Sequence, residues 1–254
     1  MTSPSKLLVA GWKGVSLIDV HGYSSFTLWL CGCNLKCPFC HNWRIASNDP
    51  AICKYADVEY IAEEVLSSKH LVTYLHVTGG EPLLQWRGLV ELFKKTCSEP
   101  LNSINSNLTL YQPLKKLLEL GLVHHIALDL KIPPEDLYGV PLSSASRLWT
   151  LFLRSLELLK KYSVQVELRI PVHRRLTREL LESYFSRVSS LLDPDRTVVI
   201  LNQLLGEPIV NPRNREWRRE NCYPSEQLLV ELAGIVKSYG FSRVYVKSIP
   251  GFSQ

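Results

Sequence analysis

Residues 33–40 read Cys-Asn-Leu-Lys-Cys-Pro-Phe-Cys, which places Cys33, Cys37 and Cys40 at a C-x3-C-x2-C spacing. Three thiolates this close together on one loop can bind one face of an iron–sulfur cubane. Such clusters normally take four cysteine ligands, so three leave one iron open to a substrate or cofactor, as catalytic zinc sites keep an open position. The motif therefore predicts a single 4Fe–4S cluster with one open iron, held by the loop 31–43.

The other cysteines do not extend this motif. Cys31 lies two residues before Cys33, and in an extended chain the two side chains point to opposite sides. Cys53, Cys97 and Cys222 are scattered. Seven cysteines in a chain without a secretion signal indicate metal or redox chemistry rather than disulfides. A structural zinc site is the alternative, but zinc sites usually carry a second C-x2-C or histidine pair downstream, and the sequence has none.

Outward from the loop, short apolar stretches alternate with longer amphipathic ones, as in a parallel sheet with crossover helices. No break in composition divides the chain. We therefore predict one domain over 1–254 with an α/β fold, a complete or partial α/β barrel of about six βα units. The expected strands are 24–30, 71–78, 101–105, 123–131, 164–170, 197–202 and 242–247, and the expected helices are 57–68, 86–97, 110–120, 147–162, 177–192 and 225–239.

Composition limits the classes of protein to which the chain can belong. Its 254 residues are 46% hydrophobic and 21% charged, which excludes wholesale disorder. No run of about 18 apolar residues predicts a transmembrane helix. Residues 1–10 hold one lysine and four consecutive apolar residues, too few for a signal peptide, so we expect a cytoplasmic protein. The net charge of +5 permits a nucleic-acid partner but does not indicate one.

The stretch 204–224 is the one long irregular connection, and it is basic. It carries Arg213, Arg215, Trp217, Arg218 and Arg219. It is either a solvated loop or a loop that contacts a partner.

A second motif follows the expected strand 71–78, where residues 78–82 read Thr-Gly-Gly-Glu-Pro. Gly79 and Gly80 allow the backbone to approach a ligand closely. The carboxylate of Glu81 suits an ammonium group.

With these two motifs the sequence resembles the radical S-adenosylmethionine (radical SAM) superfamily, and Phe39 is the aromatic residue of its cysteine motif. It is similar over nearly the whole chain to the activating proteins of anaerobic ribonucleotide reductase, relatives of the pyruvate formate-lyase activating enzymes. The stretches that carry this likeness are 16–19, 32–42, 79–85, 128–131 and 167–173.

The resemblance implies a radical SAM (β/α)6-type fold and one 4Fe–4S cluster. Cys33, Cys37 and Cys40 are its expected ligands, and S-adenosylmethionine binds the fourth iron. Phe39 and the 79–81 segment then contact this cofactor. The family's Thr-Asn-Gly segment is here Ile-Asn-Ser, in which Asn105 is the candidate for the cofactor's sugar or carboxylate.

Polar residues also alternate along two of the expected strands. His125, Asp129 and Lys131 share a face of 123–131, and Glu167 and Arg169 share a face of 164–170. A parallel strand buried on both faces should be almost entirely apolar, so these positions predict an interior that binds a charged ligand.

S-adenosylmethionine carries matching groups. Asp129 suits its ribose hydroxyls or ammonium, while Lys131 and Arg169 suit its carboxylate. The alternative is that the same residues form internal ion pairs, Asp129 with Lys131 and Glu167 with Arg169. His173, just beyond a strand end, is a further candidate for the cofactor.

The resemblance implies a radical SAM oxidoreductase that works under anaerobic conditions. It reductively cleaves S-adenosylmethionine to a 5′-deoxyadenosyl radical, with no catalytic residue beyond the cluster and the cofactor. The radical installs a glycyl radical on a partner enzyme, with anaerobic ribonucleoside-triphosphate reductase as the expected partner. Flavodoxin or ferredoxin would supply the electron.

Three alternatives remain open from the sequence. The target is a small molecule, as in 7-carboxy-7-deazaguanine synthase, although those enzymes often have a longer first cysteine spacing. The target is tRNA. Or the chain is a non-catalytic iron–sulfur electron carrier, which predicts four cluster ligands and gives 79–81 no role.

Overall fold

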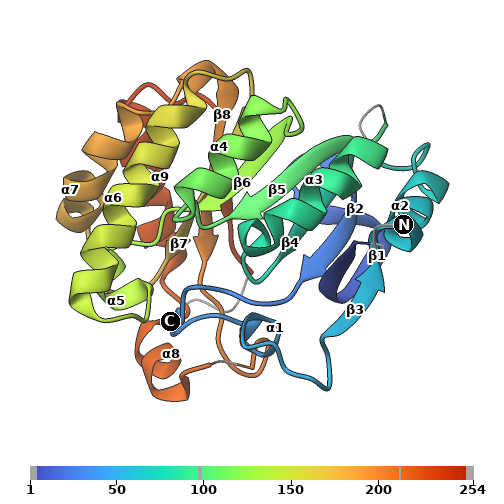
Figure 1. The fold of residues 1–254 in the computed structure, drawn as a ribbon. Coiled ribbons are helices and arrows are strands. Elements are labelled where there is room, and N and C mark those ends of the chain that lie inside the picture. The colour runs from blue at the N-terminus through green and yellow to red at the C-terminus, as the bar shows by residue number, and fades with distance from the viewer. Residues whose placement is uncertain (1–4, 97–98, 212, 250–254) are drawn as a thin grey trace. The chain divides into compact units, whose positions relative to one another are not determined.

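The computed structural model describes residues 5–96, 99–211 and 213–249 (Figure 1). These residues form two compact units. The first unit comprises residues 5–34, 42–96, 99–127 and 162–165, and the second comprises 35–41, 128–161, 166–211 and 213–249.

The first unit contains the amino-terminal strands and the helices between them. Its elements are β1 (Lys6–Val20), β2 (Tyr23–Leu30), α1 (Trp43–Ala46), β3 (Lys54–Asp57), α2 (Val58–Ser67), β4 (Tyr74–Gly79), the 3-10 helix η1 (Pro82–Gln85), α3 (Trp86–Lys95), β5 (Leu101–Ser106) and α4 (Tyr111–Glu119).

Parallel pairing in this unit places three strand ends at one edge. β1 forms an antiparallel hairpin with β2 and pairs on its other side with β3. β2, β4 and β5 are parallel and hydrogen-bonded in that order. Because parallel strands end at the same edge of a sheet, the exits from β2, β4 and β5 lie side by side. Those exits lead into Cys31, Gly80 and Asn107.

Amphipathic helices accompany these strands. α2 lies beside α3 (Figure 1), and it buries Val58, Ile61 and Val65 at the spacing of one helix face. On the strands, Leu28, Leu75 and Val77 are also fully buried. Burying each large aliphatic side chain contributes about 1.5–3 kcal/mol, so this apolar layer supports the polar strand exits.

The second unit contains the carboxy-terminal half of the chain. β6 (His125–Asp129) runs from the first unit into the second at Leu128. The remaining elements are α5 (Pro134–Leu137), α6 (Leu142–Leu159), β7 (Gln165–Val172, whose Gln165 belongs to the first unit), α7 (Arg178–Ser189), the 3-10 helix η2 (Pro194–Arg196), β8 (Thr197–Gln203), α8 (Arg215–Asn221), α9 (Glu226–Ser238) and β9 (Val244–Lys247).

The strands of the second unit are parallel as well. β8 pairs with both β7 and β9, and the backbone N–H of Leu130 donates to the carbonyl of Arg169 over 2.7 Å. α7 and α9 pack together (Figure 1), with the ring of Phe185 5.2 Å from that of Tyr239 and 5.7 Å from that of Phe241.

The alternation of strands and helices predicted from the sequence is confirmed, and so is the α/β class. The single domain over 1–254 stays a prediction. The structure adds β1, β3 and α8, which the sequence reading did not include, and α6 begins at Leu142 rather than at 147. Cys97, at the end of one expected helix, lies outside the described residues.

Candidate functional site

In the first unit, a network of side-chain amides surrounds the first cysteine of the motif. The side-chain amide of Asn107 donates to Oδ1 of Asn34 over 2.9 Å and contacts Sγ of Cys33 at 4.0 Å. Asn34 in turn donates to Thr109 over 2.7 Å. Asn107 directly follows β5, so the strand exit of a parallel sheet holds Cys33 through these bonds. The sequence reading missed Asn107, although its place just after a strand was a usable signal.

Gly79 and Gly80 pack directly on the exit of β2. The N–H of Gly80 donates to the carbonyl of Leu30 over 2.8 Å, and the N–H of Glu81 donates to that of Gly32 over 2.7 Å. Gly79 has a φ of +111°, and a Cβ on it would overlap the Leu30 backbone. A Cβ on Gly80 would overlap the Gly32 carbonyl. These positions need glycine because the start of the cluster loop occupies the space.

The carboxylate of Glu81 is fully buried and accepts several hydrogen bonds. Oε1 accepts from the N–H of Leu83 over 3.0 Å and from the hydroxyl of Ser106 over 2.9 Å. Oε2 accepts from the N–H of Asn107 over 2.7 Å. Glu81 therefore caps η1 and joins the Gly-Gly turn to the residue that contacts Cys33. Its contact with a cofactor stays a prediction.

Gln85, the last residue of η1, joins β1 to Cys31, at the start of the cluster loop. Its Nε2 donates to the carbonyls of Leu8 and Cys31 over 2.9 and 3.0 Å, and its Oε1 accepts from the N–H of Leu8 over 2.8 Å. One glutamine amide, which can both donate and accept, thus satisfies the N–H and the carbonyl of Leu8 and the carbonyl of Cys31. Asn105, a predicted cofactor residue, donates to Oγ1 of Thr78 over 3.2 Å.

Cys31 and Cys53 form a disulfide with a Cα–Cα distance of 6.1 Å. The expectation that the cysteines avoid disulfides is therefore wrong for this pair. The pairing was not readable from the sequence because spacing alone does not specify which cysteines meet. It joins the segment before Cys33 to the segment before β3, and it removes two thiols from the set of available metal ligands.

Replacing Cys53 by serine should lower the free energy of unfolding by about 3 kcal/mol, because the crosslink that restricts the unfolded chain is lost. Urea denaturation without reductant measures this difference. With dithiothreitol present, wild type and variant should unfold alike, and the variant should assemble as much cluster as wild type. Equal stability under oxidising conditions would contradict the disulfide.

In the second unit, residues 35–41 pack against the chain that follows β6. The N–H of Lys36 donates to the carbonyl of Tyr138 over 2.9 Å. A Cβ on Gly139, whose φ is +64°, would overlap the Lys36 carbonyl. Cys37 is buried and Cys40 half-buried, and the N–H of Cys40 donates to the carbonyl of Cys37 over 3.2 Å.

α8 contacts the same loop, so the stretch 204–224 is more than a solvated connection. The N–H of Asn214 donates to the carbonyl of Pro38 over 3.2 Å. Nη2 of Arg218 donates to the carbonyl of Phe39, and the Trp217 ring centroid lies 6.0 Å from that of Phe39. Arg218 is only 4% exposed. Because α8 is short and basic, no apolar periodicity predicted it.

Asp129 and Lys131 form an ion pair with Nζ 2.9 Å from Oδ2. Burial raises the pKa of Asp129, but the charges of Lys131 and Arg169 outweigh it and hold that pKa below its ordinary value. Burial lowers the pKa of Lys131, but the charges of Asp129 and the neighbouring Cys37 raise it by more. The pKa of Lys131 therefore lies above its ordinary value. Both groups are therefore charged at neutral pH, one of them beside a motif cysteine.

Arg169 and Glu167 form the second expected ion pair, with Nε 2.7 Å from Oε1. His173 is 3% exposed, and its Nε2 lies 3.1 Å from the carbonyl of Ile132. Burial lowers the pKa of His173, so the ring is neutral and Nε2 carries the proton. The alternative of internal ion pairs is thus observed for both pairs, and the cofactor roles of these residues stay predictions.

The donor chemistry fits a cluster with three protein ligands. Cys33, Cys37 and Cys40 are not part of a disulfide, whereas Cys31 is. Burial raises the pKa of the Cys222 thiol to about 11, which disfavours the thiolate that metals require. In the part of the chain that the structure describes, no three His, Cys, Asp or Glu side chains are grouped so that they could hold a metal ion. The same residues contain no helix long and apolar enough to cross a bilayer.

The chain is similar to several known proteins. At 27% identity it matches a provisionally named glycyl-radical enzyme activating enzyme of Methanocaldococcus jannaschii, over 97% of this chain and 98% of the relative. A provisionally named protein of the same kind from Haemophilus influenzae is 29% identical over 40% of this chain and 39% of the relative.

Among solved structures, a radical SAM methyltransferase from Sphaerobacter thermophilus matches with a TM-score of 0.63 and 15% identity. The match covers 94% of this chain and 70% of that one. TYW1 with a lysine-pyruvate adduct matches with a TM-score of 0.55 and 14% identity, over 84% of this chain and 73% of that one. At such low identity these likenesses concern the fold alone, and they confirm the predicted fold class.

The model of the Radical SAM superfamily matches residues 28–188, which is more than half of the chain and includes both motifs. The chain therefore belongs to the radical SAM superfamily, whose members use a 4Fe–4S cluster and S-adenosylmethionine.

Proposed function

We propose that this protein is a glycyl-radical enzyme activating enzyme and that its partner is anaerobic ribonucleoside-triphosphate reductase. The observation that supports the activase role most directly is the likeness to the Methanocaldococcus jannaschii protein, which extends over 97% of this chain and 98% of that relative. The choice of reductase rests on the sequence resemblance.

In this proposal Cys33, Cys37 and Cys40 hold the cluster, and one iron stays open for S-adenosylmethionine. A cluster held there would supply the electron for reductive cleavage of S-adenosylmethionine. The chain itself supplies position and shelter, because the radical chemistry belongs to the cofactor. Asn107, with its bond to Asn34 and its contact with Sγ of Cys33, orients the first ligand.

The Gly79-Gly80-Glu81 turn and Asn105 form the proposed cofactor surface of the first unit. Glu81 holds the turn rigid through its bonds to Leu83, Ser106 and Asn107. A turn fixed in advance loses little entropy when a ligand binds. The affinity for S-adenosylmethionine, measured separately from the amount of cluster per chain, tests this proposed cofactor surface.

The proposed cofactor residues of the second unit are Phe39, Asp129, Lys131, Arg169 and His173. Asp129 and Lys131 are both charged, and their charges match the ammonium and the carboxylate of the methionyl group. Neutral His173 offers an acceptor at Nδ1, a buried atom without a hydrogen-bond partner among the described residues.

The proposed partner step removes a hydrogen atom from a backbone glycine of the reductase, after flavodoxin or ferredoxin has delivered one electron. The experiment is anaerobic reconstitution with iron and sulfide, followed by reaction with the reductase, S-adenosylmethionine and reduced flavodoxin. Electron paramagnetic resonance should then detect a glycyl radical on the reductase, with one 5′-deoxyadenosine formed per radical.

Two controls sharpen this test. A reductase whose radical glycine is replaced by alanine should give no radical signal, and Cys37→Ala should give neither the radical nor 5′-deoxyadenosine. Cleavage of S-adenosylmethionine by wild-type protein without a radical on the reductase would contradict the proposed partner and favour a small-molecule or tRNA target.

A further inference from the structure

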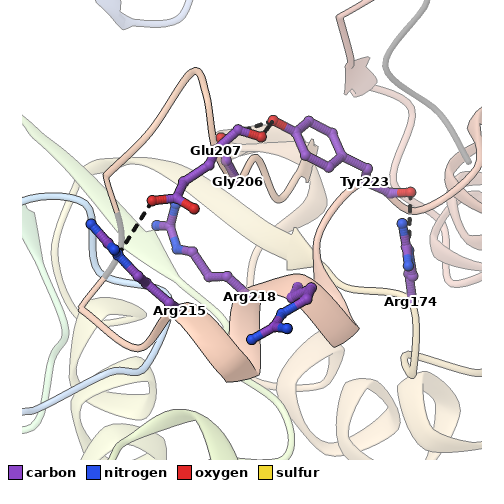
Figure 2. A pocket seen from close by; sticks show the side chains of 7 residues that line it. Arg174, Gly206, Glu207, Arg215, Arg218 and Tyr223 are labelled. Carbon is purple, nitrogen blue, oxygen red and sulfur yellow. Dashed lines mark hydrogen bonds and ion pairs between the residues drawn. The ribbon is translucent and has the colours of Figure 1, made fainter.

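A cavity of about 350 Å³ lies beside α8 in the second unit (Figure 2). This volume is within the range of small-molecule sites in proteins. The side chains that line it come from α8, from the loop after β8 and from the chain after β7. They are Arg174, Glu207, Arg215, Arg218, Arg219 and Tyr223.

The lining is strongly cationic. Four guanidinium groups and one carboxylate, that of Glu207, line the cavity, and the Glu207 carboxylate lies 3.3 Å from Nε of Arg215 (Figure 2). The side chains of the lining therefore carry a net charge of +3, from four arginines and one glutamate. Like charges held together in a partly enclosed space repel one another, and a bound anion relieves that repulsion.

Arg218 carries the strongest indication of a ligand. Its Nη1 donates to the carbonyl of Leu205 over 2.7 Å and its Nη2 to the carbonyl of Phe39. The side chain is 4% exposed, yet Nε is buried and has no hydrogen-bond partner among the described residues. A buried donor on a charged group is costly to leave unsatisfied, and because Arg218 lines the cavity, an anion bound there would offset the charge of this group.

Tyr223 also lines the cavity and connects two of the segments around it. Its hydroxyl donates to the carbonyls of Gly206 and Glu207 over 2.8 and 3.0 Å (Figure 2). Its carbonyl lies 3.4 Å from Nε of Arg174. These bonds fix the loop after β8 against the chain after β7, so the arginines surround a formed recess rather than a flat basic face.

We propose that this cavity binds a small phosphorylated ligand through its phosphoryl groups, and that the ligand is a di- or triphosphate. Guanidinium groups match phosphate oxygens in charge and in forked geometry. A single carboxylate would leave most of the positive charge unbalanced. S-adenosylmethionine is a poor occupant, because its one carboxylate is accompanied by an ammonium and a sulfonium. The inference does not rest on the proposed activase function.

Isothermal titration of the reconstituted protein with pyrophosphate, in saturating S-adenosylmethionine, tests the proposal. Wild type should bind pyrophosphate and adenosine triphosphate more tightly than inorganic phosphate. Arg219→Ala and Arg174→Ala should each weaken binding about tenfold, as expected when a charge-assisted hydrogen bond is lost. Glu207→Gln should tighten binding, because it removes the one negative charge of the lining and frees Arg215.

Arg178→Ala is the matched control, because Arg178 is an exposed arginine on α7 paired with Glu182 and outside the cavity. It should leave pyrophosphate affinity unchanged. Equal weakening by Arg178→Ala, or no binding of any phosphate by wild type, would overturn the proposal. Tighter binding of an RNA oligonucleotide than of pyrophosphate would also overturn it. The same holds if Arg219→Ala lost binding to the reductase but kept its affinity for phosphate.

Discussion

Replacing Gly79 by alanine should lower the free energy of unfolding by about 3 kcal/mol, because strained backbone and overpacking add at this position. The residue has a φ of +111°, which side chains rarely adopt, and its new Cβ would overlap the backbone of Leu30. Backbone cannot rotate away as a flexible side chain can. The exit of β2 must therefore shift, and the cluster loop begins at that exit.

Urea denaturation and S-adenosylmethionine affinity together measure this effect. Gly234 on α9 is the matched control, since nothing lies within 4 Å of a Cβ built on it. Gly234→Ala should stabilise the protein by about 0.5–1 kcal/mol, because alanine favours a helix interior over glycine. If both variants changed stability equally, the close packing of Gly79 on β2 would not be the cause.

Arg218→Met should reduce the amount of cluster that the protein assembles several-fold. The change removes the donors to the carbonyls of Phe39 and Leu205, and each buried group left unsatisfied costs about 1–3 kcal/mol. Phe39 lies between Cys37 and Cys40 of the motif, so freeing its carbonyl loosens the loop in which these proposed ligands must hold their positions. Iron and sulfide content per chain, with the resonance signal of the reduced cluster, measures the loss.

Two further variants separate this positioning role from general destabilisation. Arg218→Lys keeps the charge but loses the fork that reaches two carbonyls, and it should assemble an intermediate amount of cluster. Arg187→Met removes an exposed arginine from α7 and should assemble as much as wild type. A fully loaded Arg218→Met protein with normal S-adenosylmethionine cleavage would show that α8 does not hold the loop.

The features that the sequence predicted are those written in local patterns. The parallel strands β4 and β8 appear as short apolar runs, and the helices between strands appear as amphipathic stretches. The cysteine spacing and the Gly-Gly-Glu motif are local as well. The ion pair of Asp129 with Lys131 follows from alternation along one extended chain, so it was already an open alternative before its geometry was known.

Features that depend on contacts between segments far apart in the sequence were not predictable. The disulfide between Cys31 and Cys53 depends on where two loops come together. β1 combines glycines with exposed Leu17 and Ile18 and changes register against β2, so it lacks a clean alternation. Arg218 is charged, yet it is buried because two carbonyls far away in sequence accept its hydrogens. From the sequence it lay in a stretch that was either solvated or in contact with a partner.

The hydrogen bonds that hold the Gly-Gly-Glu turn against β2 determine which backbone groups the turn can offer to a ligand. The amide protons of Gly80 and Glu81 are both directed into the protein, where the carbonyls of Leu30 and Gly32 accept them. Neither proton is left for an incoming anion. This turn is therefore the reverse of an oxyanion hole, and the acidic end of an approaching molecule must find its hydrogen-bond donors elsewhere.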